Sequence, residues 1–324
     1  MTNILITGGC GFIGSQLVNK LHSLNCSVRV IDDFSVGDLS DLSSLKFAEQ
    51  VNATNLVWAD RVQVLQGSIL EPADCETASA GADVIIHLAA NTGVQPSILR
   101  PKFDANTNVF GTLNLLEACR VNNCRKFIFS SSGAPIGQQP PPMHENLAPK
   151  PASPYGASKL AGEGYCRAYY ECFGINTAVL RFSNIYGPGS KKKHSVVASF
   201  IKNIINGSEV FINGDGSQTR DFLYIDDLIN AIVSCIPLQT NGEVFQIASG
   251  VETSISTLFS VIQDIYRTKG NRSIHTVYRS NLIGDVQRNY SDISKAKKLL
   301  QWSPKVELKV GLTKTIEYFE RIGS

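Results

Sequence analysis

The chain has 324 residues and a formal net charge of +2, because 30 Lys and Arg residues balance 28 Asp and Glu residues. The length suggests about two domains of roughly 150 residues, and a 43% hydrophobic content is enough for a large core, which excludes wholesale disorder. The balanced charge argues against a dedicated nucleic-acid binder, and the lack of any run of about 18 apolar residues argues against a membrane span.

Short apolar runs alternate with amphipathic stretches through the first half of the chain. The predicted strands are Asn3–Thr7, Ser27–Ile31, Val62–Gln66, Asp83–Leu88, Lys126–Ser130 and Thr177–Phe182. The predicted helices between them include Phe12–Leu24, Asn108–Asn122 and Tyr155–Phe173. Continuous apolar runs are typical of parallel strands covered on both faces, so the pattern predicts an α/β fold with a doubly wound parallel sheet of the Rossmann type.

The rhythm changes after Phe182, where glycine, proline and polar residues interrupt the pattern at Tyr186–Gly189, Lys191–His194 and Asn213–Gly216. We therefore predict a first domain over residues 1–184 and a smaller mixed α/β domain over residues 185–324. Another apolar run predicts that the first sheet regains a strand near residues 243–248.

A glycine-rich turn, Gly8–Gly14, follows the first predicted strand and opens the first predicted helix. It satisfies G-x-G-x-x-G in the strand–turn–helix context that a dinucleotide-binding motif requires. Residues without Cβ let a pyrophosphate approach the backbone amides, and the helix N-terminus adds a favourable dipole. Asp32 ends the next strand, 18 residues after Gly14, where a carboxylate can accept both ribose hydroxyls and repel a 2′-phosphate. The pattern favours NAD over NADP.

Tyr155 and Lys159 form a Y-x-x-x-K pair, and their i, i+4 spacing places them on one side of a helix. An ammonium beside a phenol is expected to lower the phenol's pKa from about 10, so that Tyr155 can act as a base toward a hydroxyl. The strand Lys126–Ser130 leads into Ser132 at a ligand-binding strand end, where its hydroxyl can bond the same group. The alternative for Tyr155 and Lys159 is an ordinary pair on a helix surface. The alternative for Ser132 is a serine cluster that caps a turn.

Cysteine and histidine show no spacing of a metal site. The eight cysteines include no C-x-x-C pair, and the five histidines include no H-x-x-x-H pair. We therefore predict no catalytic metal and small buried thiols in a reducing compartment. The segment Met1–Ile6 lacks the pattern of a signal peptide, so we expect a cytoplasmic location.

These motifs together resemble the extended short-chain dehydrogenase/reductase family, in its NAD-dependent nucleotide-sugar epimerase and dehydratase branch, and most of all the UDP-hexose 4-epimerases. Matching segments run through nearly the whole chain: Thr7–Gly14, His87–Ala90, Asn108–Thr112, Ser130–Ser132, Tyr155 with Lys159, Arg181–Pro188, Gly214–Phe222, Gly284–Asp285 and Asp292–Ala296. The motifs are specific for the family and much less so for one substrate.

The resemblance implies an isomerase that keeps NAD bound and epimerises a UDP-sugar at C4, as in polysaccharide biosynthesis. Tyr155 would take the proton of the 4-hydroxyl while C4 passes a hydride to NAD. Ser132 would polarise O4, and Lys159 would bond the nicotinamide ribose. The transient 4-keto sugar would then rotate and receive the hydride on its other face. The implied substrates are UDP-glucose and UDP-galactose, UDP-GlcNAc and UDP-GalNAc, or UDP-glucuronate.

The same resemblance implies two sets of binding residues and a homodimer formed through the helices at 108–122 and 155–173. The cofactor-binding residues would be Gly8, Gly11, Phe12, Ile13, Gly14, Asp32, Asp33, Ser35, Ser68, Ile69, Leu88, Ala89, Ala90, Asn108, Ser130, Tyr155 and Lys159. The substrate-binding residues would be Ser132, Tyr155, Asn184, Val196, Arg220 and Arg288. Asn184 and Arg220 would hold the diphosphate, for which a guanidinium offers planar paired donors, and Val196 would lie near the uracil.

The residues after Ser132 favour an epimerase within this branch. The dehydratases have Asp-Glu there and the sugar decarboxylases keep a Glu, whereas this chain has Gly133-Ala134-Pro135. A dehydratase needs a general acid at the leaving hydroxyl. A 4,6-dehydratase or decarboxylase, a keto-sugar reductase and a non-catalytic NAD-binding scaffold are the alternatives. The scaffold is disfavoured because both Tyr155 and Lys159 are present.

Two positions depart from the family pattern. Ser68 stands where an Asp usually contacts adenine, and Leu282 stands where a second Arg usually holds the diphosphate. Arg279 and Arg288 are the candidates to replace that Arg.

Overall fold

The computed structural model describes residues 2–42, 48–52, 56–59, 62–270, 274–280 and 286–323. The chain divides into two compact units with interleaved segments. The first comprises Met1–Gly137, Ala148–Arg181 and Ile229–Phe245, and the second comprises Gln138–Leu147, Phe182–Leu228 and Gln246–Ser324. The predicted boundary at residue 184 lies next to the break between Arg181 and Phe182, whereas the transfer of Gln138–Leu147 to the second unit has no signal in the sequence pattern.

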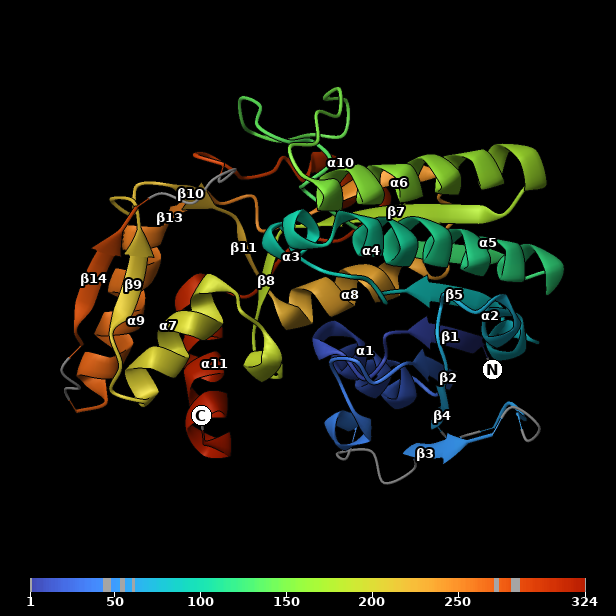
Figure 1. The fold of residues 1–324 in the computed structure, drawn as a ribbon, viewed down its shortest axis with the longest axis horizontal. Coiled ribbons are helices and arrows are strands. Elements are labelled where there is room, and N and C mark those ends of the chain that lie inside the picture. The colour runs from blue at the N-terminus through green and yellow to red at the C-terminus, as the bar shows by residue number, and fades with distance from the viewer. Residues whose placement is uncertain are drawn as a thin grey trace. The chain divides into compact units, whose positions relative to one another are not determined.

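The first unit contains an eight-stranded sheet in the order β12-β7-β6-β5-β1-β2-β4-β3. Figure 1 shows the part of it that runs from β5 through β1, β2 and β4 to β3. Its strands are β1 (Asn3–Thr7), β2 (Ser27–Asp32), β3 (Ala48–Val51), β4 (Val62–Gln66), β5 (Val84–His87), β6 (Lys126–Ser132), β7 (Asn176–Phe182) and β12 (Glu243–Ile247). The registers from β3 through β4, β2, β1 and β5 to β6 are parallel. The predicted α/β class with a parallel sheet is confirmed.

The strand order reverses at β1, because β2 lies on one side of it and β5 on the other. A doubly wound sheet binds its ligands at such a switch point, beyond the carboxyl ends of the strands. The runs Ile4–Ile6, Val84–Ile86 and Phe127–Phe129 are almost fully buried, which explains why they are apolar throughout instead of alternating.

The helices of the first unit connect these strands. They are α1 (Phe12–Ser23), α2 (Pro72–Ser79), α3 (Val94–Leu99), α4 (Pro101–Ala105), α5 (Gly111–Val121) and α6 (Pro154–Phe173), with a π-helical turn over Asn106–Phe110. α8 (Ile225–Cys235) begins in the second unit and ends in the first. α5 and α6 lie side by side (Figure 1).

Helix α6 begins and ends at residues that specify its limits. The Ser153 hydroxyl accepts a hydrogen bond from the Gly156 N–H at 3.1 Å, and Pro154 occupies the first helical position. Gly174 closes the helix with a φ of 70°, a conformation that suits glycine. These caps fix the rotation of the helix that bears Tyr155.

The second unit consists of small sheets and helices. The paired strands are β8 (Asn184–Tyr186) with β11 (Phe222–Tyr224), β9 (Val210–Asn213) with β14 (Thr276–Arg279), and β10 (Thr219–Arg220) with β13 (Thr253–Ser254). Its other helices are α7 (Val196–Ile205), α9 (Ile255–Thr268), α10 (Ser294–Leu299) and α11 (Leu308–Ile322).

Among the described residues of both units, no helix is both long and apolar enough to cross a membrane. The same residues include no group of three or more His, Cys, Asp or Glu side chains that could hold a metal ion.

Candidate active site

The turn Gly8–Gly14 packs too closely for side chains at its ends. Gly8 has a φ of 68°, and its N–H donates to the Ile31 carbonyl oxygen at 2.9 Å. A Cβ on Gly14 would lie 2.2 Å from the Gly8 carbonyl oxygen. The glycines therefore let the chain turn sharply from β1 into α1.

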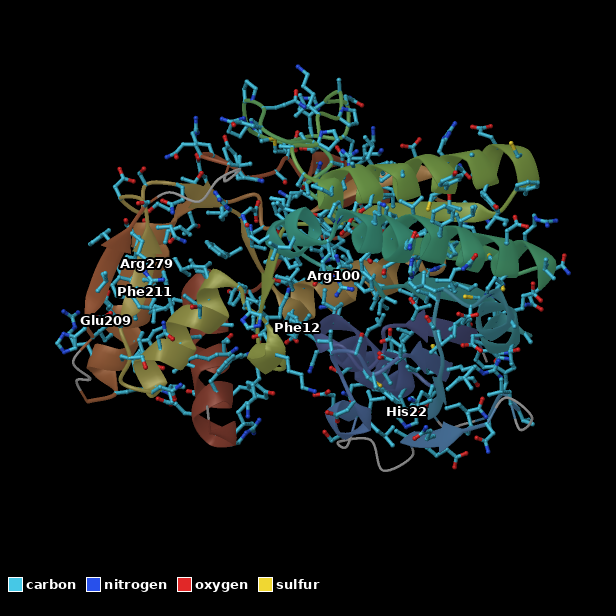
Figure 2. All side chains as sticks on the ribbon, in the orientation of Figure 1. Phe12, His22, Arg100, Glu209, Phe211 and Arg279 are labelled. Atoms are coloured by element: carbon cyan, nitrogen blue, oxygen red, sulfur yellow. The ribbon has the colours of Figure 1, made fainter. Side chains whose placement is uncertain are left out.

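Helix α1 starts within this segment, at Phe12, which Figure 2 labels. Its N-cap is Gly11, which makes no side-chain hydrogen bond to the helix, and its first turn holds Phe12 and Ile13 without an acidic residue. The dipole of an α-helix favours negative charge at such an end. Gly11, Phe12 and Ile13 are thus arranged as an anion site would require.

Asp32 lies at the carboxyl end of β2 and is 8% exposed. Its two carboxylate oxygens accept the N–H groups of Cys10 at 2.8 Å and Phe34 at 2.9 Å. Burial raises the pKa of Asp32, and these two hydrogen bonds counteract the rise. The carboxylate thereby ties the glycine turn to the end of β2. The neighbouring Asp33 is exposed and accepts from both the N–H and the hydroxyl of Ser35.

The segment after β5 is held against the glycine turn. The Thr7 hydroxyl accepts the N–H groups of Leu88 at 3.2 Å and Ala89 at 3.1 Å. A Cβ on Gly8 would lie 2.9 Å from the Ala89 Cα atom. Leu88, Ala89 and the next residue, Ala90, are each half-buried beside the turn.

Ser68 and Ile69 follow β4 on the same edge of the sheet. The Ser68 N–H donates to Asp74 Oδ2 at 2.9 Å. Ile69 is buried, and its side chain fills the space beside Gly111. The structure therefore brings the ends of β1, β2, β4 and β5 to one edge, as the sequence predicted for the cofactor-binding segments.

Asn108 is engaged on all sides within the protein. Its Nδ2 donates to the Asn91 carbonyl oxygen at 3.0 Å, to Asp104 Oδ1 at 3.1 Å and to Ser158 Oγ at 3.1 Å. Its Oδ1 accepts the Asn91 N–H at 2.9 Å. The residue is 1% exposed. These contacts hold the Asn108 side chain in one orientation, and its contact with NAD stays a prediction.

Ser132, Tyr155 and Lys159 come together at the carboxyl end of β6. Tyr155 and Ser132 share a hydrogen bond between their side chains. Lys159 Nζ donates to the Ser130 carbonyl oxygen at 2.8 Å and lies 4.8 Å from the centroid of the Phe129 ring. The predicted pair on α6 and the predicted strand-end serines thus form one cluster.

The charge states of this cluster differ from the expectation. Burial raises the pKa of Tyr155 to about 12, although the bond with Ser132 lowers it, and the Asp104 carboxylate raises it further. Burial lowers the pKa of Lys159 to about 8, while Asp104, Cys166 and Glu163 raise it. The predicted lowering of the Tyr155 pKa is wrong for the protein alone, because desolvation outweighs the bond with Ser132, which is the contribution that lowers the pKa.

Asp104 on α4 was not among the predicted site residues. It is fully buried beside this cluster. Its Oδ1 accepts from Asn91 and Asn108, and its Oδ2 has no hydrogen-bond partner. Ser158 continues the network by donating to the Tyr155 carbonyl oxygen at 3.1 Å. The i, i+4 spacing of Asp104 and Asn108 was the available signal for this contact.

The predicted substrate residues other than Ser132 and Tyr155 lie in the second unit. Asn184, at the start of β8, is exposed, and its N–H donates to the Asp221 carbonyl oxygen at 3.0 Å. Arg220 Nη1 donates to the carbonyl oxygens of Thr219 and Val286, both at 2.6 Å. Both residues adjoin Asp221, Asn184 through this hydrogen bond and Arg220 along the chain, whereas Val196 begins a separate element, α7.

The two candidates for a second phosphate-binding Arg already have partners. Arg288 forms a bidentate pair with Glu252, with both N–O distances at 2.8 Å. The Arg279 guanidinium lies over the Phe211 ring, 3.2 Å from its centroid. Figure 2 labels the two side chains next to one another. Leu282, whose substitution raised this question, is outside the described residues.

These features fit a bound dinucleotide. The turn leaves no room for a Cβ at Gly8 or Gly14, the N-terminus of α1 suits a pyrophosphate, and Asp32 supplies an acceptor at a distance along the chain that suits a ribose. The described residues of the first unit thus bring together the groups that the sequence predicted for cofactor binding and for acid–base chemistry.

Comparison with known proteins gives matches along the whole chain. A UDP-glucose 4-epimerase of Mycolicibacterium smegmatis is 35% identical over 319 residues, which cover 97% of this chain and 97% of that protein. The crystal structure of UDP-glucose 4-epimerase with UDP-glucose from Thermotoga maritima matches with a TM-score of 0.89 at 35% identity, over 99% of both chains. That of UDP-glucuronic acid 4-epimerase from Bacillus cereus, in complex with UDP-glucuronic acid and NAD, matches with a TM-score of 0.87 at 32% identity, over 99% of this chain and 100% of the other.

Relatives with another reaction are similar too. A UDP-N-acetyl-alpha-D-glucosaminuronate decarboxylase of Bacillus cytotoxicus is 30% identical over 98% of both chains. Residues 4–248 match the NAD dependent epimerase/dehydratase family. The glycine turn, the Tyr155–Lys159 pair and these similarities agree, and the chain belongs to the NAD-dependent epimerase/dehydratase family.

Proposed function

We propose that the protein is an NAD-dependent UDP-sugar 4-epimerase, an isomerase. The observation that carries the proposal is the cluster of Tyr155, Lys159 and Ser132 at the end of β6. The 4-epimerases among its relatives and among the matching structures support it. UDP-glucose or UDP-galactose, their N-acetylated counterparts and UDP-glucuronate are the candidate substrates.

The first unit would hold the cofactor through the groups described above. The Gly8–Gly14 turn and the start of α1 would bind the pyrophosphate, and Asp32 would accept the adenosine ribose hydroxyls. Leu88–Ala90 would line the cofactor side of the turn. Lys159 would bond the nicotinamide ribose, and Asn108 would keep its helix in place beside the ring.

Tyr155 would exchange a proton with the sugar 4-hydroxyl while Ser132 holds O4. When bound in its oxidised form, NAD supplies the hydride acceptor and a positive ring charge. Lys159 adds a second positive charge, and the two together would offset the burial that raises the Tyr155 pKa to about 12. The same burial favours the neutral phenol of Tyr155. That phenol would return the proton to O4 after the transient 4-keto sugar has rotated to present its other face.

The residues beyond Ser132 argue against dehydration and decarboxylation. A Cβ on Gly156 would lie 2.6 Å from the Ala134 carbonyl oxygen, so the segment Gly133–Pro135 packs on the first turn of α6. It carries no carboxylate. A decarboxylase is still the second candidate, because one such relative is 30% identical to this chain.

The second unit would bind the nucleotide half of the substrate. Asn184 and Arg220 would contact the diphosphate, and Val196 would lie near the uracil. Arg288 would contact the diphosphate only after its ion pair with Glu252 is broken. A diphosphate could compensate for the lost ion pair, because its oxygens accept from a guanidinium as the carboxylate does.

We also propose a homodimer formed through α5 and α6. Phe110, beside the start of α5, and Val121, at its end, are exposed apolar residues, as are Tyr165 and Phe173 on α6. Exposed apolar side chains on adjacent helices are typical of a surface that another molecule covers. The cytoplasmic location stays a prediction from the N-terminal sequence.

The proposal predicts that the purified protein interconverts a UDP-hexose and its C4 epimer without added NAD. NMR of a panel of UDP-sugars would identify the product and the preferred sugar. Loss of water or CO2 with no epimer formed would contradict it. A requirement for stoichiometric NADPH would instead indicate a keto-sugar reductase.

Replacing Asp32 by Asn is expected to lower the affinity for NAD by about 10- to 100-fold, because hydrogen bonds to a charged group contribute roughly 1.5–3 kcal/mol. The preference for NAD over NADP should shrink as well. Calorimetric titration of the cofactor-stripped protein measures both. Asp38→Asn is the matched control, since that exposed carboxylate accepts from the N–H and the hydroxyl of Ser40 in a local turn and belongs to neither predicted binding set. Unchanged NAD binding by Asp32→Asn would refute the assignment.

A further inference from the structure

Three residues at successive turns of α6 bond to three consecutive residues of β6. Tyr155 pairs with the Ser132 hydroxyl, and Lys159 donates to the Ser130 carbonyl oxygen at 2.8 Å. One turn later, Glu163 Oε1 accepts from the Ser131 hydroxyl at 2.5 Å. The first two contacts belong to the proposed chemistry, whereas the third involves no group of that chemistry.

Glu163 is itself fixed by a buried ion pair. Its two carboxylate oxygens accept from Arg181 Nε at 2.8 Å and Nη2 at 2.6 Å, and the two side chains are 5% and 3% exposed. Arg181 lies on β7, next to β6 in the sheet. The bidentate geometry holds the Glu163 carboxylate in one orientation, so the Ser131 hydroxyl is bonded to a group of fixed position.

Stability alone is a poor reason for such a pair. Burying two charges costs a large desolvation free energy, and well-packed apolar residues often replace a buried pair without loss of stability. Arg181 Nη1 is in addition buried without a hydrogen-bond partner among the residues that the structure describes. The pair is better explained by its hydrogen bond to Ser131, the residue between Ser130 and Ser132.

We infer that Glu163, held by Arg181, is a positioning residue that sets the place of Ser132 against Tyr155 through its bond to Ser131. The inference rests on the proposed function for its effect on turnover. A shift of the strand end changes the Ser132–Tyr155 distance, and a misplacement of about 1 Å can cost about 100-fold in rate. Because Ser131 does not touch the substrate in this scheme, substrate binding stays unaffected.

Ser131→Ala tests the inference with the ion pair intact. We expect kcat to fall about tenfold while KM stays within about twofold of the wild-type value. Thr177→Val is the matched control. Thr177 on β7 is fully buried and donates to the Cys166 carbonyl oxygen of the same helix at 2.8 Å, beyond Glu163 and away from Tyr155. An unchanged kcat in Ser131→Ala, or an equal fall in Thr177→Val, would overturn the inference.

A second variant separates position from stability. In Glu163→Met with Arg181→Met, the thermal midpoint should stay near that of the wild type, and kcat should fall as in Ser131→Ala. Full turnover by this double variant would also overturn the inference.

An ionisation measurement does not depend on turnover. The ionisation of Tyr155, read as ultraviolet absorbance against a Tyr155→Phe reference, should shift in Ser131→Ala and stay in place in Thr177→Val. If the wild-type protein converts no UDP-sugar, the proposed function fails, and this titration still decides the inference: an unmoved ionisation in Ser131→Ala refutes it.

Discussion

Tyr155→Phe is expected to lower kcat about 1,000-fold, within the range of about 10²–10⁴ that a positioned acid–base group contributes. The substitution removes only the hydroxyl that bonds with Ser132. The ring remains, so the first turn of α6 and the packing at the end of β6 should be preserved. Turnover is measured by NMR with the preferred UDP-sugar, and the thermal midpoint should stay close to the wild-type value.

The bound cofactor separates lost chemistry from lost binding in this variant. The Gly8–Gly14 turn and Asp32 do not depend on the Tyr155 hydroxyl, so the variant should still be purified with NAD. Tyr170→Phe is the matched control, because Tyr170 is a half-buried tyrosine of the same helix, close to its other end. A Tyr155→Phe protein that retains most of its turnover would exclude Tyr155 as the acid–base group.

The sheet could be predicted from sequence because its strands are buried on both faces. Ile4–Ile6 and Phe127–Phe129 are apolar runs with no alternation, and the structure forms strands there. β3 was missed for the opposite reason. It reads Ala48-Glu49-Gln50-Val51, lies at the edge of the sheet and is only partly buried, so polar residues are tolerated and no apolar run marks it.

The candidate site was predictable where one short segment sets the geometry. The spacing of Tyr155 and Lys159 places them on one helix face, and Ser132 follows directly from a strand. Contacts between distant segments gave no such signal: Arg181 and Glu163 meet only because β7 lies beside β6 beneath α6. The raised Tyr155 pKa was equally hidden, since burial is a property of the folded chain and not of a residue spacing.

Lys159→Met is expected to lower kcat about 100-fold or more, because it removes the positive charge that would favour the Tyr155 phenolate. Lys159 is 2% exposed, so methionine of similar length can fill its place. Lys126→Met is the matched control. Lys126 is also 2% exposed, burial likewise lowers its pKa, and it lies at the opposite end of β6 with its Nζ bonded to Leu238 and Thr240. A similar loss of turnover in both variants would show a general effect of buried lysines and exclude the assigned role.

The same variant should alter the pH dependence of stability. The pKa of Lys159 is lowered from 10.5 to about 8, so between those values the unfolded chain binds more protons than the folded one. The free energy of unfolding of the wild type therefore gains a contribution that rises with pH across this window, about 3 kcal/mol in total. Lys159→Met lacks that contribution, so its stability relative to the wild type should be highest at pH 7 and fall toward pH 10. Urea unfolding at several pH values measures this difference in stability. A difference that does not change with pH would mean that Lys159 titrates in the folded protein as it does in the unfolded chain. Its ammonium would then be too well solvated to act on Tyr155 as proposed.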